Sequence, residues 1–299
     1  MAVAMRVRSR TLRLTGVGPL REVDLLLLGY LGVISVLAAV RVSSRPGWWW
    51  LLVAHTLFLV LLFLVTRPGL GRFGRTLREL YPLILLPGLY GELDIINSPA
   101  LPVHDALVRK WELFVFGWQI SRNWWQAWPS SFWSTVFHGA YLSYYLIITA
   151  PALYFAWRRD LVGVRRFVLV VMTTFVACYL FFIFFPVAGP YYEFPRPAAW
   201  FIDNPTARIA YAALASGSSY GAAFPSSHVA AAVAATVAAL RMSRTLGQIL
   251  LLPTGLLTVG VVYCQMHYGV DALAGLVLGL LIGWTVGGRR GQPSTRALA

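Results

Sequence analysis

Residues 167–187 read FVLVVMTTFVACYLFFIFFPV, a stretch without a charged side chain. It is long enough to cross a bilayer, because a membrane-spanning helix needs about 20 mostly apolar residues. Of the 299 residues in the chain, 58% are hydrophobic and 12% are charged, and the mean hydropathy is +0.67. Soluble domains carry about a quarter charged residues, and disordered segments lack aromatic and aliphatic side chains. The sequence therefore predicts an integral membrane protein and excludes both of those classes.

Seven further apolar stretches accompany this one. Three of them are weaker, because one is short and contains Pro87 and Gly88, one is rich in alanine, and one contains Pro253. Membrane helices tolerate Pro and Gly because neighbouring groups satisfy the freed backbone. The predicted segments are 25–40, 48–65, 81–96, 132–157, 167–187, 224–240, 249–264 and 272–286. We expect an all-α polytopic membrane fold with about eight transmembrane segments.

The N-terminus and the two cysteines add little to this prediction. The first apolar stretch begins at Val23 and has no convincing small-residue cleavage site, so we interpret it as a retained helix rather than a signal peptide. Cys178 and Cys264 both lie in apolar stretches and are expected to be inert buried thiols.

The basic residues indicate how the segments are oriented. Eight segments place both ends of the chain on one side, and most arginines lie in the connections on that side: 1–22, 66–80, 158–166, 241–248 and 287–299. Because basic loops favour the cytoplasm, both termini are predicted to be cytoplasmic. The net charge of +14 then lies on the inner side, where it fits contact with anionic lipid headgroups rather than with nucleic acid.

The same arrangement divides the chain into four parts. They are a basic N-terminus (1–22), two N-terminal transmembrane helices (23–76), a catalytic membrane domain (77–288) and a cytoplasmic tail (289–299). The catalytic domain has two long outer connections. Residues 97–131 are rich in Trp and Phe and suit the headgroup region without spanning the bilayer. Residues 188–223 are rich in Pro, Gly, Ser and Tyr and show no helical period, so their length favours a functional loop.

The strongest local motif is Ala-Phe-Pro-Ser-Ser-His at residues 223–228, at the outer end of the alanine-rich segment. The unpaired N–H groups of a helix start bind anions. With their hydroxyl groups, Ser226 and Ser227 are therefore candidates for holding a phosphate, and His228 for acid–base chemistry. The alternative is an ordinary capped helix start with a hydrogen-bonded histidine.

A second motif lies between the last two segments, at residues 263–271. His267 and Asp271 are four residues apart, so in a helix they share a face and the carboxylate fixes the tautomer of the imidazole. A histidine oriented in this way can attack phosphorus as a nucleophile. The alternative is a capping Asp beside an interfacial His, but an ionisable pair at membrane depth is costly and indicates function. The predicted topology brings both motifs to the outer face.

Together these motifs resemble the type 2 phosphatidic acid phosphatase superfamily over about residues 130–287. The resemblance rests on Pro225-Ser226-Ser227-His228, on His267 with Asp271, and on the Ala-Leu-Ala-Gly that follows. It implies a six-helix core, to which the N-terminal helices are additions. It also implies that His267 is the nucleophile, that Asp271 orients it and that His228 is the general acid, without a metal or other cofactor.

The chain departs from the pattern of that family at both basic positions. Gly189 stands where the first motif has Lys, and Gly260-Val261 stand where the third has Ser-Arg. This form looks like the branch of inositol phosphorylceramide synthases and sphingomyelin synthases, a similarity extended by Asp105, by Phe116-Gly117 and by the tyrosines at 141, 144 and 145. For the phosphate charge that the missing residues leave uncompensated, Arg196 and Tyr191 are candidates, while Arg208 is interpreted as a surface arginine.

Several other polar residues have weaker claims on the site. Tyr192, Asp105, Glu92 and Asp94 are candidates for binding a lipid headgroup, although helix-end solvation explains Glu92 and Asp94 equally well. His55 and His138 lie within predicted spans and are interpreted as hydrogen-bonded packing residues rather than haem ligands. The tyrosines of 141–145 are interpreted mainly as packing and interface anchors.

Three functions remain open at this point. The first is transfer of a phospho-headgroup between lipids, as in inositol phosphorylceramide synthesis. The second is hydrolysis of phosphatidate or of a polyprenyl phosphate or diphosphate. The third, of another class, is proton-coupled lipid transport. The expected partners are membrane lipids, including a lipid hydroxyl as acceptor, and no nucleic acid; the sequence leaves the oligomeric state open.

Overall fold

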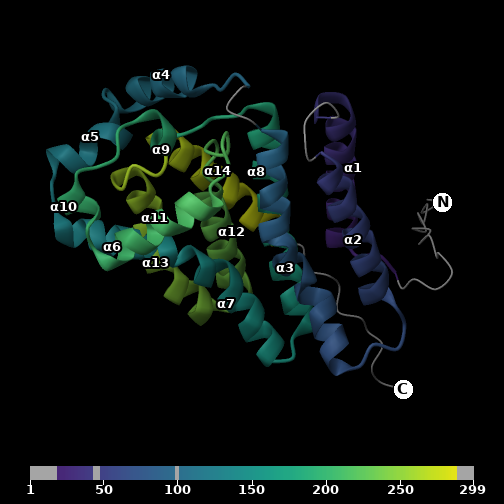
Figure 1. The fold of residues 1–299 in the computed structure, drawn as a ribbon. Coiled ribbons are helices and arrows are strands. Elements are labelled where there is room, and N and C mark those ends of the chain that lie inside the picture. Colours follow the sequence, from purple (N-terminus) through teal and green to yellow (C-terminus); the bar gives the residue numbers. More distant parts are fainter. Residues whose placement is uncertain (1–18, 43–47, 98–100, 288–299) are drawn as a thin grey trace, which may run out of the picture.

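The computed structural model describes residues 19–42, 48–97 and 101–287, and within these ranges it contains helices and no strand (Figure 1). The first helices are α1 (Glu22–Leu37), continued by the π-helical turn η1 (Ala38–Val42), α2 (Trp49–Thr66), α3 (Arg72–Ile96), α4 (Asp105–Phe116) and α5 (Ile120–Ala127). They are followed by α6 (Ser131–Leu142), α7 (Tyr144–Trp157), α8 (Leu161–Phe184), α9 (Pro190–Glu193) and α10 (Ala199–Ile202). The last are α11 (Pro205–Gly217), α12 (Ser227–Met242), α13 (Arg244–Tyr263) and α14 (Gly269–Thr285).

The predicted all-α membrane fold is confirmed. Helices long and apolar enough to cross a membrane are Glu22–Val40, Trp49–Thr66, Ser131–Trp157, Leu161–Phe184 and Arg244–Tyr263, and α12 and α14 are shorter apolar helices. Each predicted segment coincides with a helix, except that 132–157 is divided into α6 and α7 at Ser143.

Two regions differ from the expectation. Helix α3 begins at Arg72, well before the apolar stretch at 81–96, because Arg78 and Glu79 in its first turns are paired with charged partners on other helices. The connection 188–223 contains helix α11 despite its lack of a clear period. Asn204 caps that helix by accepting from the Ala207 N–H at 2.9 Å, and Pro205 occupies the first helical position, where proline is favoured.

Helices α12 and α14 pack closely because small residues face each other. Glycines 275, 279 and 283 recur every four residues along one face of α14. A Cβ at Gly275 would lie 2.5 Å from the Ser226 carbonyl oxygen, and one at Gly279 would lie 2.5 Å from that of Ala230. Small residues at this spacing let helix backbones approach in membranes. The two motifs, at the start of each helix, are therefore brought side by side.

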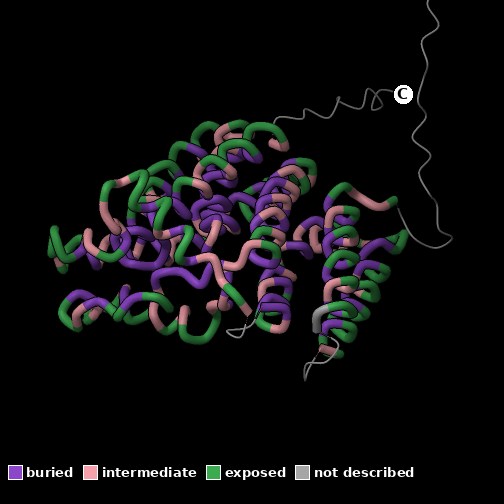
Figure 2. The backbone as a smooth tube through the Cα atoms, turned by 90° about the horizontal axis from the view of Figure 1, so that it is seen from above, coloured by how far each residue is buried: buried purple, intermediate pink, exposed green. Residues whose placement is uncertain are grey.

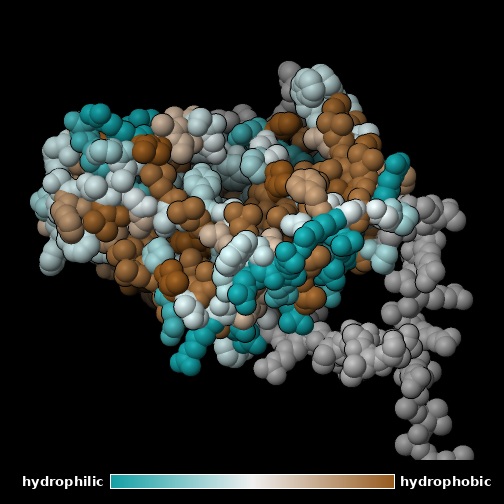
Figure 3. Space-filling view, turned by 90° about the horizontal axis from the view of Figure 1, so that it is seen from below, coloured by the Kyte–Doolittle hydropathy of each residue, from teal (hydrophilic) through white to brown (hydrophobic). Residues whose placement is uncertain are grey.

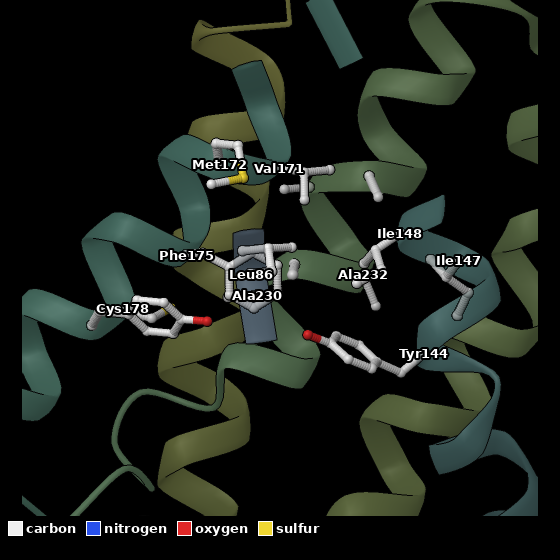
Figure 4. Close-up of a cluster of buried hydrophobic side chains, with 14 of the residues drawn as sticks. Leu86, Tyr144, Ile147, Ile148, Val171, Met172, Phe175, Cys178, Ala230 and Ala232 are labelled. Carbon is white, nitrogen blue, oxygen red and sulfur yellow. The ribbon is translucent and has the colours of Figure 1, made fainter. Parts of the chain in front are cut away.

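The core lies where α3, α7, α8 and α12 meet (Figure 4). It is built from large side chains of α7 and α8, including Ile147, Met172 and Phe175, against the alanines of α12. Seen from above, buried residues gather on the sides of the helices that face one another, and the outer turns are exposed (Figure 2). Helix α4 lies across one end of the bundle (Figure 1).

Candidate active site

The two motif histidines meet at the end of the bundle. His228 lies in the first turn of α12, His267 lies between α13 and α14, and their ring centroids are 5.8 Å apart. The backbone holds the motifs together, because the Ser226 N–H donates to the Asp271 carbonyl oxygen at 3.0 Å. The structure thus brings together residues that are far apart in the sequence, as the topology predicts.

The contacts of His267 fix its tautomer. Its Nδ1 lies 3.1 Å from the carbonyl oxygen of Ala223 and 3.5 Å from Oδ2 of Asp271. The Ala223 carbonyl oxygen can only accept a hydrogen bond, so Nδ1 carries the hydrogen and Nε2 keeps its lone pair. The carbonyl is the nearer partner, so the orientation that the sequence assigns to Asp271 is shared with the backbone of residue 223.

The surroundings of His267 also keep the ring uncharged. Its exposed fraction is 6%. Burial and, to a smaller extent, the nearby His228 lower the pKa of the imidazole and the Ala223 carbonyl opposes the shift, which leaves the pKa at about 3. A neutral ring with a free Nε2 lone pair is the form in which histidine acts as a nucleophile.

Asp271 lies in the first turn of α14, and its side chain is hydrogen bonded to the backbone at the start of that helix. Its Oδ2 accepts from the Tyr268 N–H at 2.9 Å, which closes the first turn of the helix. Its Oδ1 is buried and has no hydrogen-bond partner in the described part of the chain. Oδ2, which closes the helix turn, is also the oxygen that lies 3.5 Å from His267 Nδ1.

Tyrosines surround His228. The Tyr141 hydroxyl lies 3.1 Å from His228 Nε2, and the Tyr144 ring lies 4.5 Å from the imidazole, centroid to centroid. Within the described residues, the buried Nδ1 of His228 has no partner. From the sequence, Tyr141 was interpreted mainly as a packing and interface residue; its contact with His228, 87 positions further along the chain, shows that its hydroxyl reaches the histidine.

The start of α12 offers part of the predicted phosphate cradle. The N–H groups of Ser227 and His228 belong to the first turn and so have no acceptor within the helix. Ser226 is the N-cap, and its hydroxyl oxygen accepts from the Val229 N–H at 3.4 Å. Ser226 therefore holds the helix start, while Ser227 and the two first-turn N–H groups are left to meet an anion.

Asp105 lies under the site and fastens the loop before α9. Its Oδ2 accepts from the Ala188 N–H at 2.7 Å, and its Oδ1 accepts from the Gly189 N–H at 2.8 Å and the Tyr268 hydroxyl at 2.9 Å. The carboxylate is 2% exposed and its bonds point into the protein, so its contacts are those of a positioning residue rather than of a headgroup ligand.

The loop that Asp105 fastens lies against the residues before α12. The Ala223 N–H donates to the Val187 carbonyl oxygen at 2.9 Å. Gly189 has φ +93°, and a Cβ there would lie 2.8 Å from the Cβ of Ala223. Only glycine fits this backbone conformation and this close approach. The loop therefore sets the position of the carbonyl group that holds His267.

Glu112 is a site residue that the sequence reasoning missed. This fully buried carboxylate of α4 accepts from the Gly269 N–H at 2.8 Å and from the Ser121 hydroxyl at 2.9 Å. Burial raises the pKa of Glu112, and these hydrogen bonds partly oppose the shift. Its partner at Gly269 is 157 positions away, so the sequence carries no local signal for it.

The remaining loop candidates lie in the outer connection. Arg196 donates to the Tyr191 hydroxyl at 3.1 Å, and its guanidinium lies over the rings of Tyr191 and Tyr211. The Tyr192 hydroxyl lies 2.7 Å from that of Ser218. Arg208 is exposed and forms an ion pair with Asp203, as expected of a surface arginine.

The two acidic candidates of α3 are placed differently from each other. Glu92 is buried between α2 and α3, with Oε1 3.4 Å from His55 Nε2. Asp94 is exposed near the C-terminal end of α3. His138 lies in α6, and its Nδ1–H donates to the Ser134 carbonyl oxygen of the same helix at 2.8 Å. Among the described residues, no group of three or more His, Cys, Asp or Glu side chains is arranged to hold a metal ion.

Two histidines and a carboxylate thus lie at the paired helix starts of a bundle that contains helices of membrane-spanning length. A comparison with protein families matches residues 106–285 to the PAP2 superfamily, and the chain belongs to that superfamily. Its members are generally phosphatases, so the match supports a phosphatase or phosphotransferase type of function. Comparisons with curated proteins and with solved structures give no match.

Proposed function

We propose that this protein is a lipid phosphotransferase or phosphatase that acts through a phosphohistidine on His267. The observation that carries the proposal is the surroundings of His267. Its Nδ1 faces two acceptors, the Ala223 carbonyl and Asp271, so its Nε2 is left unprotonated. The centroid of its ring lies 5.8 Å from that of a second histidine, His228. Nothing in this chemistry requires a metal or another cofactor.

The reaction would run in two steps. In the first, His267 Nε2 attacks the phosphorus of a lipid-linked phosphate and the bond from phosphorus to the leaving oxygen breaks. His228, protonated on both ring nitrogens at this stage, gives one proton to that oxygen and becomes neutral. In the second, neutral His228 takes the proton of an acceptor hydroxyl or water while the acceptor oxygen attacks phosphorus and the P–N bond breaks. If His228 Nε2–H donates to the Tyr141 hydroxyl oxygen, Nδ1 is the nitrogen that exchanges the proton.

The phosphate would be held at the start of α12. Ser227 and the first-turn N–H groups supply neutral donors, and the positive end of the helix dipole favours the anion. Arg196 and Tyr191, already hydrogen bonded to each other at 3.1 Å, are our candidates for the remaining charge. Tyr192 and Asp94 are the candidates for the headgroup beyond the phosphate.

We further propose transfer between lipids, of the inositol phosphorylceramide synthase type, rather than simple hydrolysis. This is supported by the two positions that depart from the phosphatase pattern. The Gly189 N–H is bonded to Asp105. A Cβ at Gly260 would lie 2.9 Å from the Cβ of Phe137. Positions 189 and 260 are thus both occupied by residues without a side chain.

The topology of this proposal follows from the charges. Both termini would be cytoplasmic, and the catalytic histidines would open to the extracytoplasmic leaflet of the cell membrane. The substrates are accordingly membrane lipids, with a phospholipid or polyprenyl phosphate as donor.

The test uses purified protein in lipid with three substrates: phosphatidate, a polyprenyl diphosphate, and phosphatidylinositol together with ceramide. Released phosphate and new phospholipid are followed separately. New phospholipid that depends on ceramide supports transfer, whereas free phosphate alone supports hydrolysis. Lipid movement driven by a pH gradient without any phosphate chemistry would instead support transport.

A further inference from the structure

A cavity lies at the end of the bundle opposite the candidate active site. Its volume is about 950 Å³, and it is lined by residues from the start of α1, the α2–α3 connection, the start of α8 and the end of α14. The arginines that line it are Arg21, Arg67, Arg75, Arg78, Arg165 and Arg166. These arginines come from three separate stretches of sequence, so folding has gathered the charge in one place.

Part of this charge is neutralised within the protein. Glu79 forms ion pairs with Arg21, at 2.6 Å, and with Arg165, at 2.8 Å. Both carboxylate oxygens of Asp24 accept hydrogen bonds from Arg78, at 3.1 Å for Oδ1 and 2.5 Å for Oδ2. These buried carboxylates fix the positions of three guanidinium groups at the wall of the cavity.

Other arginines of the wall have fewer internal contacts. Arg75 donates to the Leu70 carbonyl oxygen at 3.4 Å, and the Arg67 guanidinium lies 4.8 Å from the ring centroid of Phe63. Both side chains are exposed. The six arginines that line the cavity outnumber the three carboxylates beside them, Glu22, Asp24 and Glu79. The cavity therefore has an excess of positive charge.

The cavity is also partly apolar. Alongside the arginines it is lined by Val23, Val65, Val162, Leu169 and Val286. On the face seen in Figure 3, which is the one away from α4, hydrophilic side chains gather in a band beside hydrophobic surface. A soluble anion would gain nothing from an apolar wall, whereas a phospholipid has a charged head and an apolar tail.

We infer that this cavity binds the headgroup of an anionic phospholipid from the leaflet that surrounds this end of the bundle. The phosphate is held by the guanidinium groups and the first part of the acyl chains lies along the valines. The bound lipid bridges the N-terminal helices to α8 and α14, and both of these helices run on to the candidate active site. The inference does not depend on the proposed reaction.

The experiment measures lipid binding to the purified full chain in a non-ionic detergent by native mass spectrometry. The titrants are dioleoylphosphatidylglycerol, dioleoylphosphatidylcholine and inorganic pyrophosphate. The test variant is R67Q/R75Q, chosen because these side chains make the fewest internal contacts. The matched control is R158Q/R159Q, which removes the same charge from exposed positions outside the cavity wall.

We expect phosphatidylglycerol to bind the wild type and the control alike. In R67Q/R75Q its dissociation constant should rise about 30-fold, because each arginine near an anionic lipid surface contributes about 1 kcal/mol. Equal affinity in both variants, or equal affinity for phosphatidylcholine, overturns the inference. Binding of pyrophosphate without binding of phosphatidylglycerol also overturns it. Thermal unfolding without added lipid verifies that both variants are folded.

Discussion

Replacing Asp105 by Asn tests whether the loop that supports His267 depends on one buried carboxylate. The two shapes are nearly identical, but the side-chain amide has one acceptor oxygen and one NH₂ group where the carboxylate has two acceptors. Asp105 accepts from the N–H groups of Ala188 and Gly189 through different oxygens. Whichever way the amide is turned, its NH₂ group faces one backbone N–H, and that donor is left buried without an acceptor.

The magnitude follows from these contacts. A hydrogen bond to a charged group contributes about 1.5–3 kcal/mol, and a buried donor without a partner costs about 1–3 kcal/mol more. We expect Asp105→Asn to lower the free energy of unfolding by about 3 kcal/mol or more. Tyr268→Phe removes only the 2.9 Å bond to the same carboxylate and should cost about 1 kcal/mol.

The assay is reversible unfolding of the purified protein in mixed micelles, followed by tryptophan fluorescence, with Asp94→Asn as the control. Asp94 is exposed, so its replacement removes the same charge without a buried contact. A loss of stability in Asp105→Asn no larger than that in Asp94→Asn would refute the assignment of Asp105 as the fastening residue.

Three further predictions concern the histidines and their supports. Gly189→Ala forces φ +93° on a residue with a side chain and places its Cβ 2.8 Å from that of a neighbouring alanine, so unfolding titrations should show a loss of about 3 kcal/mol. Tyr141→Phe removes the hydroxyl 3.1 Å from His228 and should lower kcat about 10-fold. Tyr144→Phe removes a hydroxyl from a ring that is tilted against the same imidazole and should leave kcat within about twofold. Equal losses of kcat in the two variants would contradict the assignment of Tyr141. The pKa of His267 is about 3 in the folded protein and has its ordinary value of about 6.5 in the unfolded chain. As the pH drops below 6.5 the unfolded chain therefore binds the proton first, and the free energy of unfolding should fall by about 2 kcal/mol at pH 5. Unfolding titrations at pH 7.5 and 5 should show that His267→Gln removes this loss.

The sequence was informative where one local stretch determines the structure. Pro225, Ser226 and Ser227 predict a helix start, and α12 begins at Ser227 with Ser226 as its cap. The apolar stretches predict the membrane helices because burial of a continuous run depends on composition alone. The predicted topology also brings His228 and His267 to one end of the bundle.

Contacts between distant residues could not be predicted in the same way. Tyr141 meets His228 and Glu112 meets Gly269 only because whole helices pack at particular angles. Helix α11 was missed although Asn204-Pro205 is a helix-start signal, since its alanine-rich sequence has a weak period. The N-terminal extension of α3 was missed because its arginines are typical of a loop until their buried partners, such as Asp24, are placed.

The central claim, that His267 carries the phosphoryl group, is tested most directly by trapping the intermediate. Protein mixed with a lipid substrate labelled in its phosphate is quenched in alkali within milliseconds, digested and sequenced by mass spectrometry. We predict an acid-labile, alkali-stable phosphohistidine on His267, absent from His267→Ala and accumulating in His228→Ala when the substrate has a good leaving group that needs no protonation. Turnover without a phosphoenzyme, or the label on another residue, would contradict the account.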